Sequence, residues 1–283
     1  MLASLEGLDH VVVMVRELDA AAERWRSLGF TLSPRGTHSA HLGTGNYTLM
    51  FGSDYMELLG VLSATPLNAP SRDFLQRRGE GIERAAFTTR DAAEGVAALR
   101  ARGIDALGPV EFSRPVDLPN GRSGEAAFSV FHWPAQQRPA DLRLFACQHH
   151  TRDTVWIAEL QSHANTTTGI VRLEIVSPQP AAAAAQLAEL IETEVETVDD
   201  GVCVRTAPGR GELLFLTPDA FSARHPALDR ALLPAEGVAA LVLRVTDLDA
   251  AARCAGPHGA RTANTVTVAA DRANGVVVVF EAA

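Results

Sequence analysis

One pattern recurs four times along the chain and constrains the fold more than any other feature of the sequence. Each copy starts at a glycine, continues as an apolar strand of about eight residues, and leads into an alanine-rich helix. Such a repeat dictates the architecture, because each copy is one supersecondary unit whose apolar face cannot be buried by that unit alone. The copies begin at Gly7, Gly81, Gly169 and Gly237.

The first copy shows what one unit contains. Val11 to Val15 form a β-branched run typical of a strand. Asp19 is suited to start the following helix and Gly29 to end it. Turn residues then separate three further expected strands, at 37–43, 46–52 and 54–61. The unit is therefore β-α-β-β-β, and the second copy repeats it with a strand at 82–89, a helix at 91–102 and strands near 108–113, 124–132 and 141–148.

The spans between the copies predict two domains, each made of one pair of units. We expect an α+β fold in which each pair forms a curved mixed sheet around a cleft, because a single unit leaves its apolar face open. A polar, irregular segment between the pairs is the expected linker. The predicted limits are 1–150 for the first domain (units 7–61 and 81–149), 151–168 for the linker, and 169–283 for the second domain (units 169–217 and 237–283).

Composition narrows the classes of function. The formal net charge of −9 and the pI near 5.5 argue against partners such as nucleic acid or an anionic membrane. All 25 basic residues are arginine, which excludes a lysine Schiff base or a P-loop lysine. Three distant cysteines suit reduced thiols, and neither a signal peptide nor a membrane-spanning run is visible. We therefore expect a cytoplasmic protein that binds a small molecule, with a homodimer as one option.

Two strands of the first unit carry a family likeness. The first contains D-H-V-V at 9–12, and the last contains Y-x-E-L at 55–58. With the paired β-α-β-β-β units, these motifs resemble the vicinal oxygen chelate superfamily, and the glyoxalase-like subgroup in particular. That superfamily includes glyoxalase I, extradiol dioxygenases and bleomycin resistance proteins. The resemblance implies one divalent metal ion (Zn, Ni, Mn or Fe) in the cleft, which chelates two neighbouring oxygens of the substrate.

His10 and Glu57 are the first two candidate metal ligands. They lie on the first and last strands of unit one, which can run side by side with both side chains facing the cleft. Imidazole nitrogen and carboxylate oxygen are ligands that these metals accept. The alternative is a surface histidine and a glutamate paired with an arginine, since an unpaired buried carboxylate is costly.

The resemblance implies a further ligand from the second unit, where Arg84 occupies the position of His10 and cannot ligate a metal. We expect His149, at the end of the last strand, to replace it. His149 is preferred to His150, and the alternative is that both belong to a loop at the domain junction. Arg84 is then free to bind an anionic substrate group, or to form a salt bridge with Glu83 or Glu57.

Other residues complete the predicted site. Glu57 is the candidate catalytic residue, as a metal ligand or as the base. Tyr55 shares the face of Glu57 by strand alternation. His41 and Asn46 flank a turn that either presents groups to a substrate or only closes a hairpin. Besides Arg84, the substrate-binding candidates are thus Tyr55, Asn46 and His41.

The leading hypothesis is a metal-dependent lyase or isomerase that acts on a small carbonyl or hydroxycarbonyl substrate. One alternative is a non-catalytic binding protein of the bleomycin-resistance type, which the missing histidine of unit two favours. A non-haem iron dioxygenase is the other alternative. Four-unit dioxygenases bind iron in their second pair of units, but Arg172 and Ala240 occupy the histidine positions there. The second domain is therefore expected to be structural, a dimerisation surface or a lid.

Overall fold

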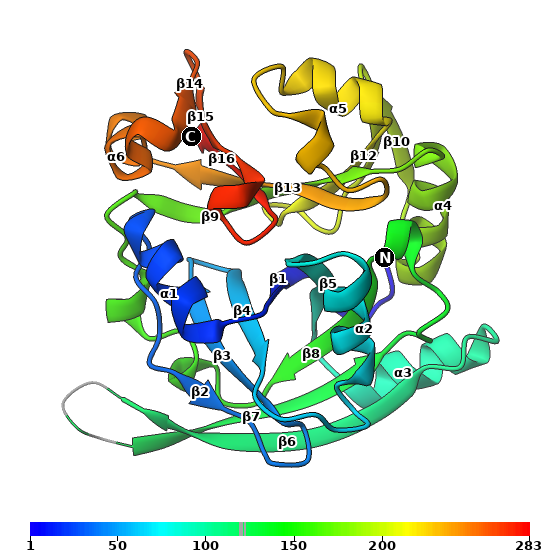
Figure 1. Ribbon diagram of the computed structural model, residues 1–283. Coiled ribbons are helices and arrows are strands. Elements are labelled where there is room, and N and C mark those ends of the chain that lie inside the picture. Colours follow the sequence, from blue (N-terminus) through cyan, green and yellow to red (C-terminus); the bar gives the residue numbers. More distant parts are fainter. Residues whose placement is uncertain (119–120, 122) are drawn as a thin grey trace.

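The strands form two eight-stranded mixed sheets (Figure 1). The computed structural model describes residues 1–118, 121 and 123–283. The strand order is β2-β3-β4-β1-β5-β8-β7-β6 in the first sheet and β10-β11-β12-β9-β13-β16-β15-β14 in the second. In both sheets the first strands of two units pair antiparallel at the centre. The predicted α+β fold of paired β-α-β-β-β units is therefore confirmed.

The first module, as we call the elements from β1 to β8, contains units one and two. Its sheet curls strongly, so that one face is concave (Figure 1). The strands are β1 Leu5–Val15, β2 Gly36–Thr37, β3 Thr44–Met50, β4 Tyr55–Val61, β5 Gly81–Thr89, β6 Leu107–Asp117, β7 Ser123–His132 and β8 Arg143–His149. The helices are α1 Leu18–Ser27, α2 Ala69–Arg77 and α3 Ala92–Ala101.

The second module, β9 to β16, contains units three and four. None of the helices in the described residues is long and apolar enough to cross a membrane. The strands are β9 Thr167–Val176, β10 Val195–Val198, β11 Gly201–Val204, β12 Glu212–Leu216, β13 Gly237–Val245, β14 Gly259–Arg261, β15 Thr265–Val268 and β16 Val277–Ala282. The helices are α4 Pro180–Ile191, α5 Pro218–Arg224 and α6 Leu248–Ala255.

One predicted strand is much shorter than expected. The prediction over 37–43 was wrong, because β2 contains only Gly36 and Thr37. The chain then turns: His38 Nδ1 lies 2.8 Å from the Thr44 hydroxyl, and Gly43 has a φ of +64°. A left-handed residue and a side chain that bonds to a nearby hydroxyl both favour a turn over a strand ladder.

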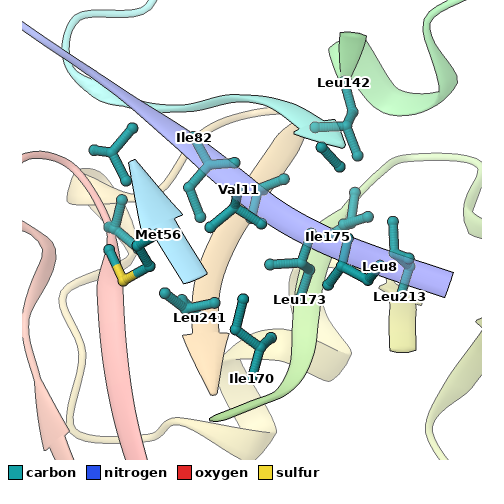
Figure 2. Close-up of a cluster of buried hydrophobic side chains, with 14 of the residues drawn as sticks. Leu8, Val11, Met56, Ile82, Leu142, Ile170, Leu173, Ile175, Leu213 and Leu241 are labelled. Carbon is teal, nitrogen blue, oxygen red and sulfur yellow. The ribbon is translucent and has the colours of Figure 1, made fainter. Parts of the chain in front are cut away.

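A single hydrophobic core joins the two modules. Leu8 and Val11 of β1 belong to the same buried cluster as Leu173 of β9 and Leu241 of β13 (Figure 2). Other clusters lie on the opposite faces of the two sheets. The modules therefore pack back to back, and we keep the predicted limits of 1–150 and 169–283 as a proposal for two domains that share this core.

Asp54 lies buried where the modules meet, between β3 and β4. Its Oδ1 accepts a hydrogen bond of 3.0 Å from the N–H of Ile170 in β9. Burial raises its pKa to about 7, although the Ile170 N–H and the charge of Arg210 act against this. Between about pH 4 and pH 7, the folded protein therefore holds a proton on Asp54 that the unfolded chain, with a pKa near 3.8, has already lost.

Because the folded-state pKa is the higher one, Asp54 should lower stability as the pH rises from about 4 to about 7. At roughly 1.4 kcal/mol per pKa unit, the rise from 3.8 to about 7 limits the loss to about 4.5 kcal/mol. We expect Asp54→Asn to be more stable than the wild type at pH 8, with a smaller difference at pH 5. Urea denaturation at both pH values measures this, with the exposed Asp73→Asn as control. An unchanged difference at the two pH values would contradict the prediction.

Candidate functional site

A β-bulge at the start of β1 directs two consecutive polar residues to one side of the sheet. Leu8 pairs with Phe87 of β5, and His10 pairs with the preceding residue, Ala86, so Asp9 has no partner of its own. Leu8 and Val11 point into the shared core. Asp9 and His10 both face the concave side, because one inserted residue shifts the alternation of the strand.

Asp9 fixes the orientation of His10. His10 Nδ1 lies 2.6 Å from Asp9 Oδ2, and the imidazole stacks on Tyr55 with ring centroids 4.1 Å apart. Burial alone would raise the pKa of Asp9, but contacts with His149 and His10 hold it well below its ordinary value. An ionised Asp9 accepts the Nδ1–H of His10, which leaves Nε2 as the acceptor nitrogen, 3.4 Å from the Tyr55 hydroxyl and 3.9 Å from Glu57 Oε2.

Glu57 lies on the same face as His10. β1 and β4 run parallel with His10 beside Tyr55 and Val12 beside Glu57, so these side chains share one side of the sheet. His10 Nε2 and Glu57 Oε2 are 3.9 Å apart, and Asn46 Nδ2 donates a bond of 2.6 Å to Glu57 Oε1. The structure therefore brings together four of the predicted residues, while the fifth from this unit, His41, is exposed in a turn.

His149 reaches the site through Asp9. Its Nε2 lies 3.1 and 3.2 Å from the two carboxylate oxygens of Asp9, and its buried Nδ1 has no partner. Within the described residues, three atoms able to ligate a metal lie within 4.8 Å of one another in Asp9, Cys147 and His149, not in the predicted triad. His150 is exposed and contacts Ser129, so His149 is the histidine that lies beside Asp9 on the concave side of the sheet.

Arg84 is held in a buried ion pair. Its Nε and Nη2 lie 2.6 and 2.5 Å from Glu83 Oε2, and Nη2 donates to the Ser71 hydroxyl at 2.7 Å. Arg143 of β8 binds the other oxygen of Glu83 at 2.5 Å. Burial would raise the pKa of Glu83, but the two guanidinium groups lower it. The salt-bridge alternative for Arg84 is thus what the structure shows, and because Arg84 and Arg143 share the single carboxylate of Glu83, these three residues keep one formal positive charge.

The second unit supplies no equivalent of the His10–Glu57 pair. Arg84 lies beside Arg143 as His10 lies beside Tyr55, and two residues further along β8 Phe145 holds the position of Glu57. The ring of Phe145 meets the His10 imidazole edge to face, with centroids 5.2 Å apart. Both candidate metal ligands, His10 and Glu57, therefore come from the first unit.

Sequence reasoning missed Arg114 of β6. Arg114 lies two residues from Phe112 and from Val116, so the three side chains share one face of β6. Phe112 stacks on Phe128 and Val116 packs against the cluster around Tyr55, so this is the concave face. Burial raises the pKa of Tyr55 well above its ordinary value, and Arg114 acts against that rise. No carboxylate of the described residues forms an ion pair with Arg114. Only the curl of the sheet brings it near β4, so no local pattern could have found it.

A family model described as a glyoxalase-like domain matches residues 8–191, more than half of the chain. The chain belongs to the family of glyoxalase-like domains. The predicted membership in the vicinal oxygen chelate superfamily is confirmed. No curated protein sequence matches the chain.

Solved structures resemble the fold of this glyoxalase-like chain. A hypothetical protein from Staphylococcus aureus is 13% identical with a TM-score of 0.72, over 98% of this chain and 99% of the other. A mutant of 4-hydroxymandelate synthase from Streptomyces coelicolor is 13% identical with a TM-score of 0.60, over 99% and 93%. Methylmalonyl-CoA epimerase from Mycobacterium tuberculosis is 18% identical with a TM-score of 0.41, over 54% and 94%. At these identities, the two full-length matches show a shared fold.

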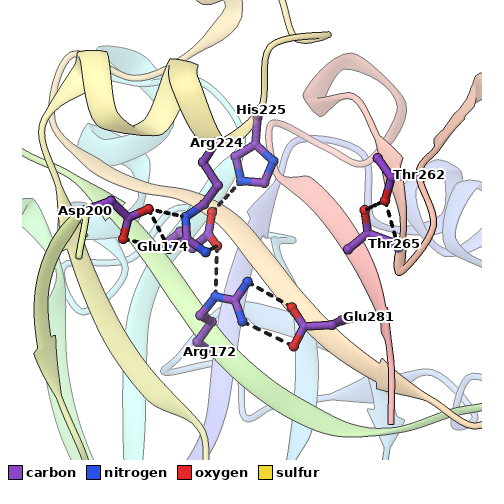
Figure 3. Close-up of polar contacts among 8 residues, drawn as sticks. All are labelled: Arg172, Glu174, Asp200, Arg224, His225, Thr262, Thr265 and Glu281. Carbon is purple, nitrogen blue, oxygen red and sulfur yellow. Dashed lines mark hydrogen bonds and ion pairs between the residues drawn. The ribbon is translucent and has the colours of Figure 1, made fainter. Parts of the chain in front are cut away.

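The second glyoxalase-like module carries an ion-pair network on its own concave face (Figure 3). Arg172, at the position of His10, donates to Glu174 at 2.9 Å and pairs with Glu281 at 3.0 Å. His225 Nε2 lies 2.5 Å from the other oxygen of Glu174, which is fully buried. Glu281, which could have been an exposed chain-end carboxylate, is therefore part of this network.

A cavity of about 700 Å³ lies above this network, between α5 and the β14–β15 hairpin. Arg224 also lines it and binds Asp200 through two hydrogen bonds of 2.8 and 2.9 Å. The guanidinium and carboxylate groups of the network are thus already paired with one another. The geometry indicates arginines that are bound by carboxylates of the same network rather than a cation left for a ligand.

The Glu83 ion pairs yield a stability prediction. Glu83→Gln would leave the buried Arg84 and Arg143 without their shared counter-ion, which should cost about 3–5 kcal/mol of unfolding free energy. Urea denaturation measures the loss. The exposed Glu111→Gln on β6 is the control and should change stability by less than about 0.5 kcal/mol. Equal stability of the two variants would contradict this account of Arg84.

Proposed function

We propose that the chain is a metal-dependent lyase or isomerase of the glyoxalase type, acting on a small carbonyl or hydroxycarbonyl substrate in the cleft of the first module. One observation carries the proposal. His10 Nε2 and Glu57 Oε2 face each other across 3.9 Å, while Nδ1 of His10 is bonded to the buried Asp9.

The donor set fits a divalent metal ion. One imidazole nitrogen and one carboxylate oxygen suit Zn, Ni, Mn or Fe. Two atoms that bind one ion at about 2.1 Å lie about 3.0–3.5 Å apart. The distance of 3.9 Å between His10 Nε2 and Glu57 Oε2 would therefore have to shorten slightly. The Asp9–His10 contact is the arrangement in which a carboxylate orients a metal-binding histidine. His149 is kept as a proposed third ligand, which would have to exchange its contact with Asp9 for the ion.

A bound ion would supply Lewis-acid polarisation of the substrate carbonyl oxygen. The chain supplies the other functions. Glu57, oriented by Asn46, is the proposed base for the proton on the carbon next to that carbonyl. Tyr55 keeps its proton because burial raises its pKa, so its hydroxyl can donate to a substrate oxygen. Arg114 is the proposed cation for an anionic substrate group, since the guanidinium of Arg84 already donates to Glu83 and Ser71.

A non-catalytic binding protein is the second candidate. Arg84 and Phe145 hold the positions at which the second unit would place its own ligands. This leaves two candidate metal ligands, His10 and Glu57, where two equivalent units would together supply four. The alternative keeps the cleft and its aromatic wall, and it predicts no stoichiometric metal.

Metal binding tests the proposal. We expect the purified protein to bind one equivalent of Mn²⁺ or Zn²⁺, and His10→Ala and Glu57→Ala to weaken binding roughly 100-fold or more, because each removes a direct ligand. Isothermal titration calorimetry measures the affinity, and the exposed His41→Ala serves as a matched histidine control.

The same titration on His149→Ala decides the third ligand, since wild-type affinity would remove His149 from the site. A wild-type protein that binds no divalent ion near neutral pH would favour the binding protein instead. Oxygen consumption with Fe²⁺ would point to the dioxygenase alternative.

A further inference from the structure

The loop between β11 and β12 of the second module contacts the start of β1. Thr206 is buried, and its Oγ1 accepts a hydrogen bond of 3.0 Å from the N–H of Leu8. The same hydroxyl donates to the Gly211 carbonyl at 2.7 Å, which fixes its direction. Leu8 directly precedes the bulged Asp9, so the second module holds the backbone at the point where the strand becomes irregular.

Gly7 shows how closely this loop packs. It has a φ of +105°, and a Cβ there would lie 2.6 Å from Arg210 Cγ and 2.9 Å from Ala207 Cβ. Any side chain at this position would collide with the loop and strain the backbone. The first glycine of the repeat therefore serves two purposes in this unit. It stands at the start of the repeat, and its lack of a side chain lets the β11–β12 loop pack against it.

Arg210 extends the contact toward the site. Its Nη1 donates to the carbonyls of Ser53 and Leu8, the latter at 3.4 Å. Its Nη2 lies 3.5 Å from the Thr88 hydroxyl, and that hydroxyl donates to Asp9 Oδ1 at 2.7 Å. No carboxylate of the described residues forms an ion pair with Arg210. Its donors are thus directed to the groups that surround Asp9.

These contacts compensate for the bulge. A bulged residue leaves the regular ladder, and its neighbours need other hydrogen-bond partners to keep their direction. Thr206 and Arg210 supply partners to the N–H and C=O of Leu8, and Thr88 supplies one to Asp9. The chain Arg210–Thr88–Asp9–His10 ends at Nδ1 of His10, and the other nitrogen of the same ring, Nε2, is the one proposed to bind the metal.

We propose that the β11–β12 loop is a positioning element for the site of the first module, with Arg210 as its main residue. Arg210 holds Asp9 through Thr88, and Asp9 holds the tautomer and ring orientation of His10. This inference rests on the proposed function for its metal readout only. It gives the second module a specific task, although that module lacks the His10–Glu57 pair.

The first test uses the metal-free, full-length protein. ¹⁵N NMR of labelled histidines at one fixed pH, where the rings are neutral, reports which nitrogen of His10 carries the proton. We expect Nδ1–H in the wild type and a mixture of both tautomers in Arg210→Ala. Arg205→Ala is the matched control, because Arg205 lies in the same loop but is exposed, and among the described residues its ion pairs are with Glu196 and Glu212.

The second test measures affinity for Mn²⁺ and Zn²⁺ alone. Arg210→Ala should weaken binding roughly 10–100-fold, as expected for a partner that orients a ligand. Arg210→Lys, which keeps one donor and the charge, should recover part of the loss and covers the case in which the alanine variant does not fold. Thr88→Val should act in the same direction, and combining it with Arg210→Ala should add less than the sum of the two effects.

The outcomes separate the two proposals. A folded Arg210→Ala variant with the wild-type His10 tautomer and wild-type metal affinity would overturn the positioning role. An equal effect of Arg205→Ala would also overturn it. If the wild type binds no metal, the proposed function fails, yet the NMR comparison still tests the positioning role.

Discussion

The β-bulge at Asp9 is the constraint on which the candidate site depends. In a regular strand, alternation would place Asp9 and His10 on opposite sides of the sheet, so one of the two would face the aliphatic core, where an unpaired polar group costs several kcal/mol. The bulge instead places Asp9 beside His10, where the carboxylate has two imidazoles and the Thr88 hydroxyl as partners. The direction of His10 Nε2 toward Glu57 follows from that contact.

The bulge belongs to the architecture, whereas the polar pair belongs to the first unit. In the second module, Val238 pairs with Ile175 and Ala240 with Glu174, so β13 has a bulge at the matching place. It holds Ala239 and Ala240, both buried, in place of Asp9 and His10. The backbone geometry therefore does not require a charged site. The repeated fold offers equivalent positions, and different units fill them with an aspartate and a histidine, with ion-paired arginines or with alanine.

The shared core explains how the second module, which lacks a His10–Glu57 pair, can still affect the candidate site of the first module. Burial of apolar surface between β1 and the strands of the second module fixes where the two sheets lie relative to each other. This packing brings the 205–211 loop to the start of β1, where Thr206 and Arg210 bind the backbone of Leu8. A contact between the modules at this point reaches the site directly, although the two concave faces point away from each other.

The sequence by itself determined the four β-α-β-β-β units, the α+β class and the shared face of His10 and Glu57. These follow from apolar periodicity, glycine positions and strand alternation, which are properties of short segments. Only the tertiary structure decided the rest: that Arg84 and Arg143 share the carboxylate of Glu83, that Asp9 stands between His10 and His149, and that Arg114 and Arg210 approach from distant parts of the chain. Ion pairing and hydrogen bonding are settled by which groups the curl of the sheet and the packing of the modules bring within a few ångströms, and no local pattern of residues encodes that distance.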